Sequence, residues 1–155
     1  MIRKATEEDM MFLFDLKNQP SVLRWSFNSN PVPLETHQVW FQQKLHDPLT
    51  ALYVIEESGR AIGQVRFDRE KDPNSPAIIS IDITAEQRGK GFGKKAIVES
   101  LEEFFREHPD ITTVAASIYL ENKASQGAFA RAGFSVPTVC SKHPDRVHMQ
   151  YIRSS

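Results

Sequence analysis

A run of alternating glycines is the clearest chemical signal in this chain. The segment from Ile81 to Lys95 reads IDITAEQRGKGFGKK, with glycine at positions 89, 91 and 93. Glycine has no Cβ, so the backbone can turn tightly there with its N–H groups facing one side. An amphipathic segment follows directly, and the start of a helix adds free N–H groups and a positive dipole end. Together these features predict an anion cradle suited to a pyrophosphate.

Basic side chains surround this turn. Lys94 and Lys95 fall in the first turn of the predicted helix, where the dipole disfavours cations by up to about 1 kcal/mol. Arg88 and Lys90 add charge of the same sign just before it, and a bound polyanion would relieve the repulsion. For Lys90 and Lys95 the alternative is that long side chains extend into water. The residues predicted to hold the pyrophosphate, within the loop from Gln87 to Lys94, are Arg88, Gly89, Lys90, Gly91, Phe92, Gly93 and Lys94.

Two other phosphate-binding loops are excluded by their spacing. The P-loop requires a glycine five positions before Gly-Lys-Ser/Thr, but Arg88 holds that position and Lys95 follows Gly93-Lys94. The dinucleotide fingerprint requires its last glycine where Lys94 stands, and an acid about twenty residues later. Residues 111–113 are Ile, Thr and Thr, so that pattern fails as well.

The flanking residues predict the elements that position this loop. Ala77–Thr84 (AIISIDIT) is the strongest strand signal, and apolar residues at helical spacing follow the loop as far as Phe105. Alternating or β-rich segments predict further strands at residues 1–5, 51–57, 61–67, 112–118, 134–139 and 147–152. Helices are predicted near residues 10–16, 34–47 and 122–131, with a capping-box-like start at Thr6 and a C-cap at Gly133. A mixed sheet with helices on both faces is the natural packing for this order, an α/β fold.

Length and charge restrict the class of protein. The 155 residues fit one domain spanning 1–155, and 19 basic against 20 acidic residues leave no nucleic-acid footprint over the whole surface. No apolar run reaches about 18 residues and no secretory signal follows Met1, so a membrane partner is not expected. The single Cys140 fits a reducing cytoplasm, and the five His show no metal-ligand spacing, so no metal is predicted.

The glycine loop resembles a known family signature. The run from Arg88 to Gly93 is similar to the Arg/Gln-x-x-Gly-x-Gly/Ala motif of the GNAT family of N-acetyltransferases. Downstream, residues 122–125 (NKAS) and 132–134 (AGF) resemble the second region of that family. The resemblance implies the GNAT fold, a mixed sheet of about seven strands with helices on both faces and a splayed parallel strand pair. It also implies acetyl-CoA as co-substrate, held between the strands at 77–84 and 112–118.

The resemblance also implies contacts for the pantetheine arm. Ile81, Asp82 and Ile83 are expected to contact it through their backbone. Asn122 and Ser125 are expected at the same arm. For Asn122 the alternative is that its side chain caps the last helix, a role that asparagine favours.

The implied reaction is attack of a primary amine on the thioester. The amine must lose a proton to attack, and Asp82 is the candidate base, because it is the only acid in its strand; Ser80 shares its face by alternation. The alternative for Asp82 is a structural hydrogen bond. Many family members place a tyrosine as general acid where Phe129 stands here, so Tyr119, Ser125 or water would have to protonate the thiolate.

The acceptor region resembles a narrower group, the amino-sugar N-acetyltransferases of bacterial nonulosonic acid (pseudaminic-type) pathways. The similar segments are residues 17–20 (KNQP), His37, residues 40–41 (WF), 63–68 (GQVRFD) and 79–81 (ISI). This implies a small-molecule amine acceptor, a UDP-linked 4-amino-4,6-dideoxy sugar. The acceptor contacts expected on that basis are Arg24, Trp25, Asn28, His37, Trp40 and Arg66.

Several alternatives stay open at this level. Trp40 and Phe41 are also what a helix core would contain, and His37 could be a cap. A peptide N-terminal amine is the second acceptor hypothesis, and a non-catalytic acyl-CoA-binding module is the third function, favoured by Phe129. The sequence leaves a monomer and a dimer equally open.

Overall fold

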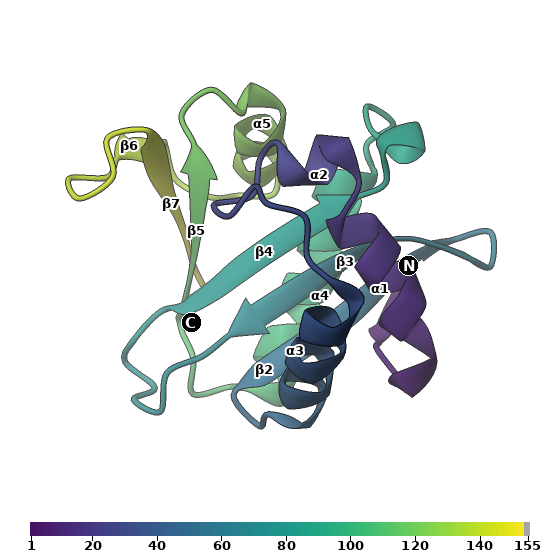
Figure 1. The fold of residues 1–155 in the computed structure, drawn as a ribbon. Helices are drawn as coiled ribbons and strands as arrows, with labels where there is room; N and C mark the ends of the chain where they lie inside the picture. Colours follow the sequence, from purple (N-terminus) through teal and green to yellow (C-terminus); the bar gives the residue numbers. More distant parts are fainter. Residues whose placement is uncertain (154–155) are drawn as a thin grey trace.

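A seven-stranded mixed sheet with helices on both faces organises residues 1–153, the part of the chain that this computed structural model describes (Figure 1). Its strand order is β1-β2-β3-β4-β5-β7-β6. The strands are β1 (Ile2–Lys4), β2 (Thr50–Glu57), β3 (Arg60–Asp68), β4 (Ala77–Ile83), β5 (Thr113–Tyr119), β6 (Thr138–Val139) and β7 (Arg146–Ile152). The helices are α1 (Met10–Lys17), α2 (Pro20–Leu23), α3 (Leu34–His46), α4 (Phe92–Glu107) and α5 (Lys123–Arg131).

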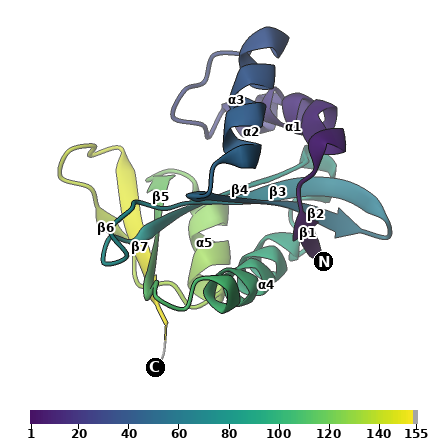
Figure 2. The same ribbon diagram turned by 90° about the horizontal axis from the view of Figure 1, so that it is seen from below.

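The two helical layers bury the two faces of the sheet separately. Helices α1, α2 and α3 cover one face, and α4 and α5 cover the other (Figure 2). Alternation along β3 sends Val65 and Phe67 into the larger core, where the Phe67 and Phe104 rings stack with centroids 4.3 Å apart. The opposite face of the sheet meets a smaller cluster that includes Leu16 and Phe41. The polar side chains of β3 and β4 therefore face the α1–α3 layer.

The parallel pair β4 and β5 separates after a short contact. Only Ala77↔Val114 and Ile78↔Ala115 are paired, although β4 stays paired with β3 as far as Ile83. β5 in turn stays paired with β7 as far as Tyr119. Beyond the contact, each strand therefore presents an unpaired backbone edge to the other. This opening confirms the splayed parallel pair and the GNAT fold predicted from the sequence.

Two segments differ from the sequence prediction. The strand expected at residues 134–139 is reduced to Thr138–Val139, because Gly133 turns the chain with φ 106° and Phe134 packs on Phe129 instead. Residues 20–23 form the short helix α2, although no period marks them in the sequence. Pro20 occupies the start of that helix, where its fixed φ fits and its missing N–H is not needed.

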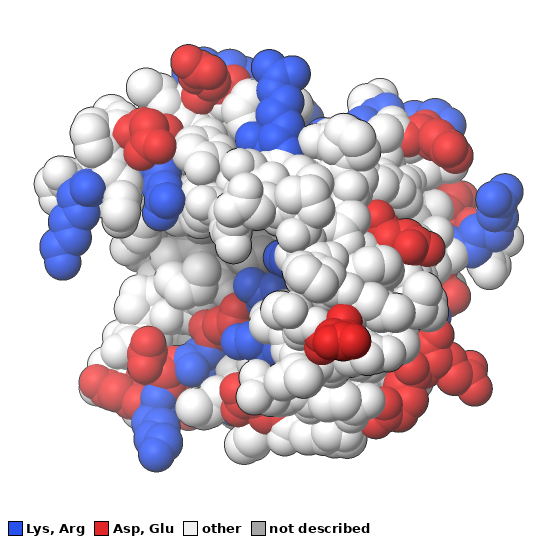
Figure 3. Space-filling model, viewed as in Figure 1, with Lys and Arg blue, Asp and Glu red and all other residues white. Residues whose placement is uncertain are grey.

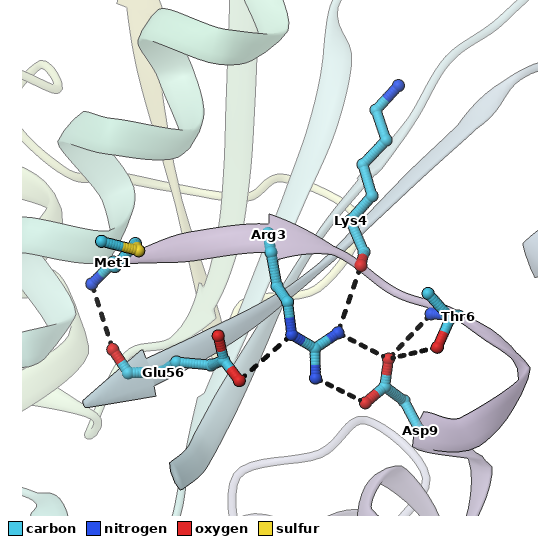
Figure 4. Close-up of polar contacts among 6 residues, drawn as sticks. All are labelled: Met1, Arg3, Lys4, Thr6, Asp9 and Glu56. Carbon is cyan, nitrogen blue, oxygen red and sulfur yellow. Dashed lines mark hydrogen bonds and ion pairs between the residues drawn. The ribbon is translucent and has the colours of Figure 1, made fainter. Parts of the chain in front are cut away.

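A partly buried ion pair, between the half-exposed Arg3 and the buried Asp9, fixes the start of α1 (Figure 4). Arg3 on β1 donates two hydrogen bonds of 2.8 Å to the Asp9 carboxylate, which also accepts from the Thr6 backbone N–H at 2.7 Å. Arg3 also contacts Glu56 on β2, with Nε and Oε2 3.1 Å apart. The capping box expected at Thr6 is present. Because Arg3 and Thr6 stabilise the carboxylate form, they hold the pKa of Asp9 below its ordinary value despite its burial.

Candidate active site

A cleft of about 600 Å³ lies where β4 and β5 diverge. The exposed edges at residues 79–83 and 116–119 line it, together with the glycine loop and the first turns of α5. Its other wall comes from the end of α1 and from residues 25–28, which follow α2. Figure 3 shows this face hollowed, with both basic and acidic side chains exposed in and below the hollow. The cleft therefore joins the loop predicted to bind pyrophosphate to the polar face of the sheet.

The glycine loop has the backbone conformation that its sequence predicts. Gly89 and Gly91 have φ of 76° and 84°, values that side chains with a Cβ rarely adopt. Gly91 is the N-cap of α4, no side chain caps that helix, and Lys95 N donates back to Gly91 O at 3.4 Å. The amides of the first turn are therefore available to a ligand. This loop and its cations fit a CoA pyrophosphate.

Most of the predicted loop residues line the cleft. Lys90 does not; its ammonium donates to Gln87 Oε1 at 3.3 Å. Arg88 Nε donates to Ile83 O at 3.2 Å, which ties the loop to the end of β4. The predicted contacts that line the cleft are Arg88, Gly89, Gly91, Phe92, Gly93 and Lys94.

The start of α5 combines two of the sequence-based interpretations. The Asn122 side chain accepts a hydrogen bond from Ser125 N at 3.2 Å, so it caps the helix, and both residues also line the cleft. Phe129 is 2% exposed and packs edge-on against Phe134. Its phenyl ring carries no ionisable proton, so it cannot protonate the thiolate. Tyr119 lies at the end of β5, and its hydroxyl donates to Ser26 O at 3.4 Å. Of the proton donors considered for the thiolate, Tyr119 and Ser125 both reach the cleft.

The candidate base lies in a polar patch on the α1–α3 face of the sheet. Asp82 is paired in register with Gln64, and Ser80 with Arg66, so these four side chains share one face. Gln64 Nε2 donates to Asp82 Oδ2 at 2.7 Å. The structural hydrogen bond considered for Asp82 is therefore present, and its second oxygen, Oδ1, is left for another donor.

Two cations flank this patch and share an aromatic platform. Lys17 Nζ lies 5.6 Å and Arg66 Cζ 5.3 Å from the centroid of the Trp40 ring. Arg66 Nε is paired with Asp68 at 2.7 Å, whereas Lys17 forms no ion pair within residues 1–153. The pKa of Lys17 lies below its ordinary value. Burial is the main cause, the Asp82 carboxylate opposes it by raising the pKa, and Arg66 lowers the pKa further.

Three residues proposed as acceptor contacts, Arg24, His37 and Trp40, lie outside the cleft. His37 is 1% exposed and packs among Phe14, Trp40 and Phe41; its Nε2 is 3.2 Å from Met10 O. Arg24 lies over the Trp25 ring, 4.8 Å from its centroid, and faces a second hollow of about 360 Å³. The Trp40 ring contacts Lys17 and Arg66 instead of lining the cleft. The acceptor contacts that the structure does bring there are Trp25, Asn28 and Arg66.

Lys17 and Gln64 are the site residues to which the sequence assigned no role. Gln64 carried a signal, because it alternates with Arg66 in a strand that is otherwise apolar. Lys17 entered only as the first residue of the similar segment 17–20, since its position at the cleft depends on where α1 crosses the sheet. Within residues 1–153 no three metal-ligating side chains converge, and no helix has the length and apolarity to cross a membrane.

Comparison with known proteins identifies the family. The model of the acetyltransferase (GNAT) domain matches residues 1–135, so this chain belongs to the GNAT family. It is an N-acetyltransferase that uses acetyl-CoA as co-substrate, rather than a non-catalytic acyl-CoA-binding module. The glycine loop, the open strand edges and the free helix start described above are the parts that fit this co-substrate.

Individual relatives differ in the amines that their names mention. Aminoglycoside N(6')-acetyltransferase type 1 of Klebsiella pneumoniae is 23% identical over 146 residues, which cover 86% of this chain and 72% of that protein. Spermidine N-acetyltransferase from Vibrio cholerae, solved with CoA and spermine, superposes with a TM-score of 0.84 at 20% identity, covering 99% and 95% of the two chains. Ribosomal-protein-alanine N-acetyltransferase from Brucella melitensis superposes with a TM-score of 0.78 at 25% identity, covering 98% and 99%.

Proposed function

We propose that the acceptor is the primary amine of a nucleotide-linked amino sugar, a UDP-linked 4-amino-4,6-dideoxy sugar. The observation that carries this proposal is the charge of the cleft. Asp82 is the single carboxylate among its described lining residues, against six cations. Those cations are Lys17, Arg66, Arg88, Lys94, Lys123 and Arg131.

The charges divide between the two substrates. The four cations on the glycine loop and α5 lie beside the expected CoA phosphates. Lys17 and Arg66 lie on the opposite side, with Asp82. Each unit of negative charge about 5 Å from such a cation gains about 3 kcal/mol of attraction at an effective dielectric of 20. Arg66 is already paired with Asp68, so Lys17 is the cation left for a phosphate. A second ammonium of a polycation at the same position would be repelled by Lys17, so this charge pattern favours an anionic acceptor over spermidine and aminoglycosides.

Aromatic side chains supply the second support. Trp25 and Phe27 both line the cleft, and both rings contact Tyr119, at centroid distances of 6.4 and 5.0 Å. They could stack on a uracil or a sugar face, as aromatic rings in ligand pockets commonly do. Asn28 beside them adds an amide for hydroxyl or carbonyl groups.

In the proposed reaction, Asp82 accepts the proton that the acceptor amine must lose. The amine nitrogen then forms a bond to the thioester carbonyl carbon, the carbon–sulfur bond breaks and the thiolate takes a proton. Tyr119, Ser125 or solvent supplies that last proton. The unpaired edge of β4, at residues 79–83, offers backbone groups that hold the pantetheine arm beside Asp82.

A peptide N-terminal amine is the second candidate acceptor. It is favoured by the similarity to the Brucella melitensis ribosomal-protein-alanine enzyme, at 25% identity over nearly the whole of both chains. We also propose a cytoplasmic location, which the free thiol of Cys140 supports.

A panel of acceptors tests the proposal. The protein is incubated with acetyl-CoA and a UDP-linked 4-amino-4,6-dideoxy sugar, the same sugar without UDP, spermidine, kanamycin, or a peptide that begins with alanine. Thiol release gives kcat/KM for each. We expect the UDP-linked sugar to exceed the others by at least about tenfold, since one well-placed ionic contact is worth about 1.5–3 kcal/mol. A higher kcat/KM for a polycation or for the peptide would contradict the proposal.

A further inference from the structure

Gln64 is the most buried polar side chain on the cleft face of the sheet. It is 6% exposed, lines the cleft and lies opposite Asp82 in the β3–β4 register. Its Nε2 donates to Asp82 Oδ2, whereas its Oε1 is buried with no hydrogen-bond partner among the described residues. A buried carbonyl oxygen without a donor is costly, so this atom indicates a missing ligand group.

The orientation of this amide follows from the charge of its neighbour. An ionised carboxylate only accepts hydrogen bonds, so the Gln64 NH₂ group must face Asp82. The flipped amide would place two oxygens against each other. Gly63 supports this register, because a Cβ there would collide with the backbone oxygen of Asp82. Gln64 Oε1 is thus directed away from Asp82.

We propose that Gln64 and Asp82 together form the binding site of the acceptor amine, with Gln64 as a positioning residue. Asp82 Oδ1 and Gln64 Oε1 each accept one N–H of the incoming amine. Two acceptors fix the direction of the nitrogen lone pair, which one carboxylate alone would leave free to rotate. This inference rests on the proposed function, in which Asp82 takes the amine proton.

The proton balance is complete with groups already described. An acceptor ammonium loses one proton to Asp82 and from there to solvent. The neutral nitrogen forms the N–C bond while the C–S bond breaks. The second proton leaves the nitrogen to solvent, and the CoA thiolate takes one proton from Tyr119, Ser125 or solvent. Where a side chain donates that proton, solvent replaces it. Gln64 takes part by accepting an N–H throughout and by holding Asp82 Oδ2, so it gains and loses no proton.

Two substitutions separate the two ends of the amide. Gln64→Met keeps the length and removes both polar groups. We expect it to lower kcat/KM for the acceptor by at least about tenfold and to leave acetyl-CoA affinity unchanged. Gln64→Glu is isosteric and places a carboxylate beside Asp82. Since two adjacent carboxylates do not both ionise easily, the acidic limb of the kcat/KM profile should move up by about one pH unit or more. The charged groups nearby, Lys17 and Arg66, are the same in all variants.

The measurement uses whichever acceptor of the panel has the highest kcat/KM, so it does not depend on the sugar assignment. Gln38→Met, an exposed glutamine on α3, is the matched control and should behave as wild type. Calorimetric acetyl-CoA affinity verifies that each variant is folded. Wild-type acceptor kinetics for Gln64→Met, or an unshifted pH profile for Gln64→Glu, would overturn the inference. The proposed acceptor is tested separately by the panel. If the wild-type protein does not acetylate the UDP-linked sugar, the proposed function fails, whatever the Gln64 variants show.

Discussion

Removing the charge of Lys17 is the most direct test of an anionic acceptor. Lys17→Met keeps an unbranched apolar stem that can still pack against Trp40, so the wall of the cleft should keep its shape. The ammonium has no ion-pair partner within residues 1–153, so its loss leaves none of their carboxylates unpaired. The expected effect therefore falls on the acceptor side of the cleft, where Lys17 lies near Asp82, and not on acetyl-CoA binding.

The size of the effect follows from what remains after the substitution. A charge-assisted hydrogen bond to phosphate is worth about 1.5–3 kcal/mol, which corresponds to about tenfold to a hundredfold in affinity. Arg66 compensates little, because its guanidinium is already paired with Asp68 at 2.7 Å. We expect the KM for the UDP-linked sugar to rise within that range, with acetyl-CoA affinity unchanged.

The assay compares the UDP-linked sugar with the same sugar lacking the nucleotide. Steady-state thiol release gives KM for each, and calorimetry gives the acetyl-CoA affinity. Lys71→Met, a lysine on the exposed loop between β3 and β4, controls for a general loss of positive charge. An equal change in KM for both sugars would refute a phosphate contact at Lys17, and so would a wild-type KM for the UDP-linked sugar.

Three further predictions concern the loop, the base and the N-terminus. Gly91→Val should weaken acetyl-CoA binding, measured by calorimetry, at least about tenfold, or 1.4 kcal/mol. The control is Gly59→Val, at φ +76° in the remote β2–β3 turn. Equal acetyl-CoA affinity for the two variants would disprove the pyrophosphate site. Asp82→Asn should reduce kcat about a hundredfold while acetyl-CoA affinity holds; full turnover across pH would leave water as the proton acceptor. The pKa of Asp9 is lower in the folded protein than in the unfolded chain. The ionised carboxylate therefore stabilises the fold fully at pH values above the unfolded-state pKa, and this contribution is lost as the pH falls through the folded-state pKa. Urea unfolding should therefore show Asp9→Asn to be less stable by about 1–2 kcal/mol at pH 7, with a smaller difference at pH 3; a constant difference would show that the Arg3 ion pair is not its source.

The loop and its supporting elements could be predicted because their requirements are local. Positive φ at Gly89 and Gly91 and the uncapped start of α4 are properties of consecutive residues. The helix cap at Asn122 and the left-handed turn at Gly133 are of the same kind. The strand predicted at residues 134–139 was wrong at residues 134–137, because Phe134 packs in the core instead of pairing.

The acceptor side depended on contacts between distant segments. The sequence suggested Arg24 and His37 as acceptor contacts, on the basis of resemblance. In the structure, α1 and α3 pack so that His37 is enclosed by aromatic rings, and Arg24 faces a separate hollow. Lys17 reaches the cleft instead, from the end of a helix whose start is held by the Arg3–Asp9 pair and whose apolar side packs with Phe41.

The sequence by itself predicted the anion cradle, since a glycine turn and the helix start after it are local features of consecutive residues. The acetyl transfer was implied by the resemblance to the GNAT family. Alternation along single strands also put Ser80 and Asp82 on one face. Only the tertiary structure decided which partners that face receives. The pairing of Gln64 with Asp82 requires the β3–β4 register across an intervening loop, and the approach of Lys17 requires α1 to cross β3 and β4. Neither is encoded by spacing along the chain, because both depend on how separate elements bury their apolar faces against one another.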